Sequence, residues 1–339
     1  MDLKTLTELN GISGDEGLVR RALMEAARPH CDEISIDRSG NLICKKKGSN
    51  PELPEVLFAA HMDEVGFIIA GYADDGLLRI RPVGGIDPRV IVSKWVQVGP
   101  DKVPGVIGAM AIHLQTDADR KKVLDYDSLY IDIGAKDKAE AEKLAPLGTY
   151  AAFDTAYMPF GEGMVIAKAL DDRVGCYNML RLLEGSYPCD ITCCFVTQEE
   201  VGLRGSIGAA YAIEAEVALV FEGTAANDMG DVPESQRVCQ VGHGVTVSFM
   251  DGASVGNREL FKLLPALAEN AGIPCQIKQG VTGGNDAGSF QYGGATGAGT
   301  ARTMVLGVPC RYIHSGASVA ALSDIDAQLH LAQEYLNNL

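Results

Sequence analysis

Hydrophobic and polar positions follow one another along this chain in a way that predicts short buried strands between amphipathic helices. Residues 56–60, 191–197 and 217–221 are largely apolar runs, as expected of strands that are covered on both faces. Beyond residue 163 we expect helices at 172–183, 206–213, 257–271 and 323–336, and a further strand at 244–250. Strands that alternate with helices predict an α/β fold in which a mixed or parallel sheet is sandwiched by helices.

The N-terminal segment carries separate signals for a helix and a hairpin. Ser13 and Glu16 have the spacing of a capping box, and apolar residues at helical spacing follow through Ala26. The β-type segments 33–37 and 42–46 are separated by a Ser-Gly-Asn turn. This order predicts one helix followed by a β-hairpin.

The middle of the chain has a different pattern of residues. From about residue 66 to residue 163, short β-type segments are broken by Gly and Pro. We expect strands at 78–83, 90–98, 105–114 and 129–133 and one helix at 138–144. This stretch predicts a small all-β domain, residues 67–163, inserted between the two parts of a larger domain, residues 1–66 and 164–339.

Composition and charge exclude some classes of partner. The 339 residues include 45 acidic and 29 basic side chains, which gives a formal net charge of −16. Nucleic acids and anionic membranes attract clustered Lys and Arg, so neither is expected as a partner. The nine cysteines show no CxxC pair, and no leader or spanning segment is visible. We therefore expect a cytoplasmic protein with free thiols.

Three predicted strands end in side chains that commonly bind metals. The first runs into His61 and Asp63, the second into Glu199 and Glu200, and the third into Glu222. The carboxyl ends of strands in open α/β sheets form the functional crevice. Several carboxylates at one buried edge repel one another unless a cation neutralises them.

Two further candidates lie elsewhere in the chain. Asp171 begins a predicted helix, and His314 follows a strand-like segment at 311–313. Taken singly, Asp171 fits a first-turn acid, Glu199 and Glu200 fit surface acids, and His61 fits a core histidine. Their joint occurrence favours a divalent metal site, with two ions as the simplest arrangement.

A serine hydrolase is a competing interpretation. The segment 252–256 matches G-x-S-x-G around Ser254, and Asp286 and His314 follow in the order of an α/β-hydrolase. A nucleophile elbow needs a helix that starts directly after the serine, whereas Asn257 has the character of an N-cap three residues later. This interpretation also leaves the strand-end acids without a role, and we disfavour it.

Several segments together resemble the M42 family of dinuclear metallo-aminopeptidases, whose members are called glutamyl aminopeptidase, deblocking aminopeptidase or endoglucanase. The resemblance covers nearly the whole chain. The segments are AHMDEVGF at 60–67, GGIDPR at 84–89, YIDIG at 130–134, KALDDR at 168–173, TQEEVG at 197–202, GGNDAG at 283–288 and RYIHS at 311–315.

The resemblance implies a role for each candidate. It makes Asp171 the carboxylate that bridges two metal ions, with His61 and Glu222 completing one site and Glu200 and His314 the other. Glu222 stands where characterised members often have Asp.

The resemblance also gives roles to two residues that are not metal ligands. Glu199 would be the general base, and Asp63 would orient the imidazole of His61. The chemistry agrees, since a water activated by two metals needs a base that is not itself a ligand.

The resemblance also implies cofactors, partners and assembly. Two divalent ions are expected per subunit, with zinc or cobalt favoured and manganese possible. Residues 67–163 would be a β-barrel or PDZ-like dimerisation domain of a homo-oligomer, in some relatives a dodecamer. The substrate would be a short peptide. A glycan hydrolase and a catalytically weak metal-binding assembly protein are the alternatives. The Gly-rich run 280–299 fits either a pocket floor or plain tight turns.

Overall fold

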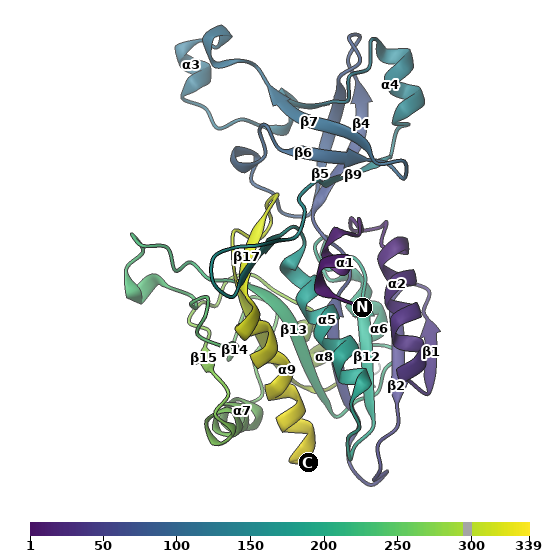
Figure 1. The fold of residues 1–339 in the computed structure, drawn as a ribbon, viewed down its shortest axis with the longest axis vertical. Coiled ribbons are helices and arrows are strands. Elements are labelled where there is room, and N and C mark those ends of the chain that lie inside the picture. The colour runs from purple at the N-terminus through teal and green to yellow at the C-terminus, as the bar shows by residue number, and fades with distance from the viewer. Residues whose placement is uncertain (294–299) are drawn as a thin grey trace.

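The computed structural model describes residues 1–293 and 300–339. Within them an eleven-stranded mixed sheet and a closed six-stranded barrel form two separate bodies, and Figure 1 shows the barrel standing at one end of the sheet-and-helix body. The predicted α/β fold with a mixed sheet and a β-barrel is therefore confirmed. The division into catalytic and dimerisation domains stays a prediction about function.

The large sheet is mixed, with parallel strands at its centre. Nine of its strands pair in the order β1, β2, β12, β3, β13, β16, β17, β11 and β10. Strand β14 pairs with β16 and also with β15. The strands are β1 Glu33–Ile36, β2 Leu42–Lys46, β3 Val56–His61, β10 Met158–Pro159, β11 Met164–Ala167, β12 Ile191–Val196, β13 Val217–Ala225, β14 Val245–Ser248, β15 Cys275–Ile277, β16 Arg302–Arg311 and β17 Ser318–Ala321. The pairs β12–β3, β3–β13 and β13–β16 are parallel, so their carboxyl ends meet at one edge.

Helices cover both faces of this sheet. Alternate residues of β3 divide between two cores: Phe58 packs in the larger core, and Leu57 in the smaller one on the opposite face. The helices α2, α5, α7 and α9 pack in the larger core, and α6 and α8 in the smaller one. The helices are α1 Leu3–Glu8, α2 Gly17–Ala27, α5 Leu170–Glu184, α6 Arg204–Ala209, α7 Arg258–Ala271, α8 Ala287–Tyr292 and α9 Leu322–Asn337.

The barrel has its own core, separate from the sheet. Phe67 and Phe153 meet there edge to face, with ring centroids 5.3 Å apart. Closure pairs every barrel strand with two neighbours, which leaves no open sheet edge. In pairing order the strands are β4 Gly66–Tyr72, β5 Leu78–Val83, β8 Leu129–Asp132, β7 Val103–Ala109, β6 Trp95–Val98 and β9 Tyr150–Phe153. Two helices accompany them, α3 Asp117–Arg120 and α4 Lys138–Leu144.

Some predicted elements differ from the observed ones. The strand expected at 90–98 shortens to β6 because Pro88 fixes the backbone of a preceding turn, the 3₁₀ helix Pro88–Val90. The strand expected at 105–114 is β7 followed by the 3₁₀ helix Ile112–Leu114. The capping box is wrong: no side chain caps α2, and the hydroxyl of Ser13 instead donates to Asp63, 2.6 Å away.

Within the described part of the chain, no helix is both long enough and apolar enough to cross a membrane.

Candidate metal centre

Two candidate ligands come from neighbouring parallel strands. His61 is the last residue of β3, and Glu222 lies in β13 beside it. Val220 pairs with Ala59, so two residues further along Glu222 comes opposite His61, on the same face of the sheet. The strand predicted to end just before Glu222 in fact continues to Ala225, because β13 pairs with β16 along its whole length.

Asp171, at the start of α5, lies between two imidazoles. Its Oδ1 is 3.4 Å from Nε2 of His61, and its Oδ2 is 3.7 Å from Nε2 of His314. Gly223 allows this position, because a Cβ at residue 223 would lie 2.8 Å from Cα of Asp171. The Gly223 amide also donates to Oδ1 of Asp171 at 3.3 Å. A carboxylate with one oxygen facing each imidazole is suited to bridging two cations.

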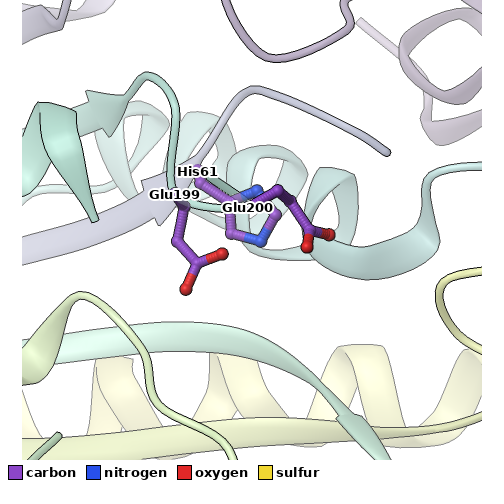
Figure 2. A group of neighbouring side chains, drawn as sticks. All are labelled: His61, Glu199 and Glu200. Atoms are coloured by element: carbon purple, nitrogen blue, oxygen red, sulfur yellow. The ribbon is translucent and has the colours of Figure 1, made fainter. Parts of the chain in front are cut away.

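Glu199 and Glu200 follow β12, and the carboxylate of Asp63 fixes their backbone. Oδ1 of Asp63 accepts the Glu199 amide at 3.0 Å, and Oδ2 accepts the Glu200 amide at 3.2 Å and the Ser13 hydroxyl. Figure 2 shows the carboxyl groups of Glu199 and Glu200 on different sides of the His61 ring. The two adjacent acids are therefore held so that they can serve different roles.

Main-chain carbonyl groups orient both imidazoles. Nδ1 of His61 is 3.1 Å from the carbonyl oxygen of Asp63 and 3.6 Å from its carboxylate. Nδ1 of His314 is 2.9 Å from the carbonyl oxygen of Gly85, in the loop that follows barrel strand β5. When Nδ1 donates to these carbonyl groups, Nε2 of each ring is free to ligate. The carboxylate of Asp63 thus contributes less to orienting His61 than its own carbonyl group does.

The candidate ligands form two groups that share Asp171. The inner group is His61, Asp171 and Glu222, with Nε2 of His61 3.5 Å from Oε1 of Glu222. The outer group is Asp171, Glu200 and His314, with Nε2 of His314 3.2 Å from Oε2 of Glu200. In each group the ligand atoms lie within 4.8 Å of one another, close enough to surround a single cation. His61 also forms a third such set with Glu199 and Glu200.

Burial makes the carboxylates of the centre hard to ionise without a cation. It raises the pKa of Glu200 to about 7 and that of Glu199 to about 9, and it holds the pKa of Glu222 well above its usual range. Burial opposes the ionisation of Asp171 as well. Hydrogen bonding to His61 and the charges of His61 and His314 outweigh it, so the pKa of Asp171 is lowered. Among the three acids of the two groups of candidate ligands, the shared carboxylate is thus the one that ionises most readily.

The imidazole of His61 behaves in the opposite way. Burial alone would lower its pKa, but Asp171, Asp63 and Glu222 together raise that pKa well above the usual value. The inner group therefore stabilises a positive charge at its centre. In addition, Nε2 of His61 and Oε2 of Glu222 are buried without a hydrogen-bond partner in the described structure. Such atoms cost about 1–3 kcal/mol each unless a ligand satisfies them, so the residues fit a bound cation.

The structure brings all seven predicted site residues together, but it does not support the serine-hydrolase alternative. The Ser254 hydroxyl donates to Asp251 at 2.8 Å, and Asn257 caps α7 as expected. Of the Gly-rich run, residues 282–285 line a pocket beside the centre, and residues 294–299 lie outside the described residues.

Sequence reasoning missed the contacts that Ser13, Gly85 and Gly223 make in the centre. Gly85 belongs to the segment 84–89, which the family resemblance includes, but nothing in the sequence indicates that its carbonyl group reaches His314.

Several known proteins that resemble this chain in fold and sequence are peptidases. The fold matches an aminopeptidase from the archaeon Desulfurococcus kamchatkensis, with a TM-score of 0.93 and 32% identity over 99% of this chain and 94% of that one. It also matches the Pyrococcus horikoshii TET1 peptidase, with a TM-score of 0.86 and 32% identity over 99% and 98% of the two chains. The lysyl aminopeptidase of Pyrococcus furiosus is 32% identical over 99% of this chain and 96% of its own. The protein is a peptide hydrolase of the aminopeptidase class.

The family model described as M42 glutamyl aminopeptidase matches residues 40–331. The chain belongs to the M42 family of aminopeptidases, as the sequence motifs predicted. Glycosidases work with two flanking carboxyl groups and no metal, so the glycan-hydrolase alternative fits neither the family nor the centre.

Proposed function

We propose that this aminopeptidase binds two divalent cations in the inner and outer groups and removes N-terminal residues from short peptides. The observation that carries the proposal is the position of Asp171, whose two carboxylate oxygens face His61 on one side and His314 on the other. Zinc and cobalt suit mixed imidazole and carboxylate ligands, and manganese is a third possibility. When bound, two such ions lower the pKa of a water molecule and polarise the carbonyl group to be attacked.

We assign the role of general base to Glu199. It accepts the proton of the attacking water and then delivers it to the amine that leaves. Burial raises the pKa of its carboxyl group in the metal-free chain, and two bound cations would offset that effect, so that the ionised carboxylate can accept the proton. Asp63 keeps Glu199 in position through the Glu199 amide. Glu200, held by the same carboxylate, faces His314 and acts as a ligand.

Replacing Glu199 by Gln tests this assignment. The variant removes the base and preserves the shape, so we expect two bound metal ions per chain and a loss of kcat of about 100- to 10,000-fold on an aminoacyl anilide. Elemental analysis after gel filtration, together with stopped or continuous assays, measures both quantities. Near-normal turnover would rule out the role, and loss of one metal ion would make Glu199 a ligand.

We also propose that the chain acts as a homo-oligomer that assembles through the barrel. Large apolar side chains of the barrel region are exposed: Trp95 on β6, and Met110, Ile112, Leu114 and Val123 in the segment that follows β7. Exposed apolar side chains in this number favour contact with another surface. The similar TET1 peptidase of Pyrococcus horikoshii can assemble into a tetrahedron or a large octahedral shell. A mass of 35.9 kDa in light scattering, that of one chain, would contradict the proposal.

We place the enzyme in the cytoplasm, because all nine cysteines are free, and seven of them are buried. Recovery of the native protein from the secreted fraction, with disulfides formed, would contradict this.

A further inference from the structure

Three charged side chains lie buried beside the metal centre, between the end of β3 and the start of α5. They are Glu64, Lys168 and Arg173, which we call the charged cluster, and no more than 3% of each residue is exposed. Glu64 and Lys168 line a cavity of about 10 Å³ together with the proposed ligands Asp171 and Glu200. Burying a charge costs free energy unless opposite charges and hydrogen bonds offset the cost, so each member of the cluster depends on its partners.

Glu64 is the residue that the other members of the cluster contact. Its two carboxylate oxygens accept hydrogen bonds from Nζ of Lys168, at 2.6 Å and 2.8 Å. One of them, Oε1, also accepts the Gly11 amide at 3.0 Å and a longer contact from Nη2 of Arg173 at 3.4 Å. The Glu64 amide donates back to the Gly11 carbonyl group at 3.0 Å. Charge-assisted hydrogen bonds are among the strongest in proteins, so both the side chain and the backbone of Glu64 are firmly held.

Arg173 holds the residue on the other side of Asp63. Its Nε donates to the carbonyl oxygen of Met62 at 2.8 Å. The rest of its guanidinium group donates to main-chain carbonyl groups at and just after the end of α1. Since Met62 and Glu64 flank Asp63 in the sequence, the cluster fixes the backbone on both sides of Asp63.

Asp63 is the residue through which this restraint reaches the metal centre. Its carboxylate accepts the amides of Glu199 and Glu200 at 3.0 Å and 3.2 Å, and its carbonyl oxygen lies 3.1 Å from Nδ1 of His61. A shift of Asp63 therefore moves the proposed base and a proposed ligand together. Misplacing a reacting group by about 1 Å can cost about 100-fold in rate.

Stability alone does not account for the charges of the cluster. Two cations face a single acid, so the cluster is not a neutral pair. Well-packed apolar side chains in place of buried charged groups are often as stable or more stable. What the charged groups add is direction, because their hydrogen bonds hold Glu64 in one place.

We infer that Glu64 is a positioning residue that, held by Lys168 and Arg173, fixes Asp63 and through it the general base Glu199. This inference rests on the proposed function, because it assumes that Glu199 is the base. The cluster itself takes no part in the chemical step. It sets where the base lies when the water is attacked.

Lys168→Met tests the inference with little change in side-chain volume. The substitution leaves Glu64 and Arg173 as a pair of one acid and one base. At saturating cobalt we expect kcat on an aminoacyl anilide to fall by about 10- to 100-fold, with two metal ions retained per chain. KM should stay within about threefold, because the larger pocket beside the centre is lined by other residues.

A second background separates positioning from a general structural effect. When Glu199→Gln has already removed the base, Lys168→Met has no base left to misplace, so it should lower the remaining kcat by no more than about threefold. Single-turnover measurements resolve these slow rates. An equal loss in both backgrounds would overturn the inference, and so would an unchanged kcat for Lys168→Met alone.

Asn178→Ala is the matched control on the same helix. Asn178 is buried in α5, and its amide donates to the Ile325 carbonyl group and to Gln328, both at 2.8 Å. The variant loses buried hydrogen bonds without touching the cluster, so kcat should stay within about twofold. A loss as large as that of Lys168→Met would make general loosening of α5 the explanation and overturn the inference.

Glu64→Gln covers the case in which Lys168→Met fails to fold, as judged by circular dichroism. It preserves the shape of the side chain, removes its charge and should show the same dependence on Glu199. If neither variant folds, the cluster is a structural element only and the inference is wrong. Near-normal turnover of Glu199→Gln alone would instead contradict the proposed function, so the two failures are distinct.

Discussion

The inner and outer groups share Asp171 but are built from different parts of the molecule. The inner group takes His61 and Glu222 from two adjacent parallel strands, and His61 is only 1% exposed. The outer group takes Glu200 and His314 from loops, and the His314 side chain is 38% exposed. The inner group is therefore fixed by the sheet, whereas the outer group depends on how its loops are held.

The support for the two imidazoles differs in the same way. His61 faces a carbonyl group only two residues away, that of Asp63. His314 faces the carbonyl group of Gly85, which is 229 residues away in sequence and belongs to the barrel. The outer group is thus complete only when barrel and sheet are docked together. We expect tight metal binding in the inner group and weaker, barrel-dependent binding in the outer group.

Removing each imidazole in turn should separate the two groups most clearly. His61→Ala leaves Glu222 buried without its imidazole, so the inner ion and nearly all turnover should be lost, and excess metal should not restore them. His314→Ala should weaken binding of the outer ion by at least about 100-fold, and excess cobalt should restore part of the turnover.

Metal content after gel filtration and kcat at limiting and excess cobalt measure this difference. Circular dichroism melts identify any variant that fails to fold. If excess metal rescued both variants equally, the two groups would be equivalent and the comparison wrong.

The pH dependence of stability in the metal-free protein gives a second test of the centre, with a smaller expected effect. Without metal, burial raises the pKa of Glu200 from 4.5 to about 7, so the folded chain keeps a proton there that the unfolded chain has released. This contribution to stability is complete below pH 4.5 and is lost as the pH rises through 7. Glu199, Glu222 and His61, whose pKa values are also raised, act in the same direction.

We therefore expect the melting temperature of the metal-free protein to fall by about 5 °C or more between pH 5 and pH 8. Metal affinity should rise over the same range, because the cation replaces protons. Asp171 and Asp63 have lowered pKa values, so their opposite effect appears only as the pH falls below 3.8. Calorimetry in two buffers of different ionisation enthalpy counts the released protons. No proton release at pH 6 would contradict the expectation.

The same contrast explains how far the sequence could predict this site. His61 and Glu222 come from apolar strands, where a period of two residues and a parallel register determine position, so their meeting could be foreseen. The closed barrel could be foreseen only in outline: its strands β4 and β9 were not predicted, because closure depends on pairing between distant segments.

The supports of the centre could not be predicted, because they are single contacts between loops. Ser13 has the local spacing of a helix cap, yet tertiary structure directs its hydroxyl to Asp63. The contact between Gly85 and His314 depends on the docking of two bodies that no local pattern encodes. Local periodicity thus predicts ligands on strands better than it predicts what orients ligands on loops.

The smallest expected effect tests the link from the barrel to the outer group. Gly84 has φ +85°, and a Cβ there would lie 2.7 Å from Cγ1 of Val65 and 3.4 Å from Cβ of Glu200. Gly84→Ala should therefore shift the loop that carries the Gly85 carbonyl group away from His314. The loss of an orienting contact should weaken outer-ion affinity by about 10-fold, while inner-ion affinity stays the same. Titration with cobalt, followed by its visible absorption, resolves the two binding steps.

Gly134→Ala provides the matched control for this experiment. Gly134 also lies in the barrel region with a positive φ, +74°, but a Cβ there has no heavy atom within 4 Å. The Gly134→Ala substitution introduces a similar backbone strain without a clash at the metal centre. Both metal-binding steps of this variant should therefore match those of the wild type. If Gly134→Ala weakened the outer step as much as Gly84→Ala, general loss of barrel stability would explain both results. If only Gly84→Ala does so, the barrel loop is part of what holds the second metal ion.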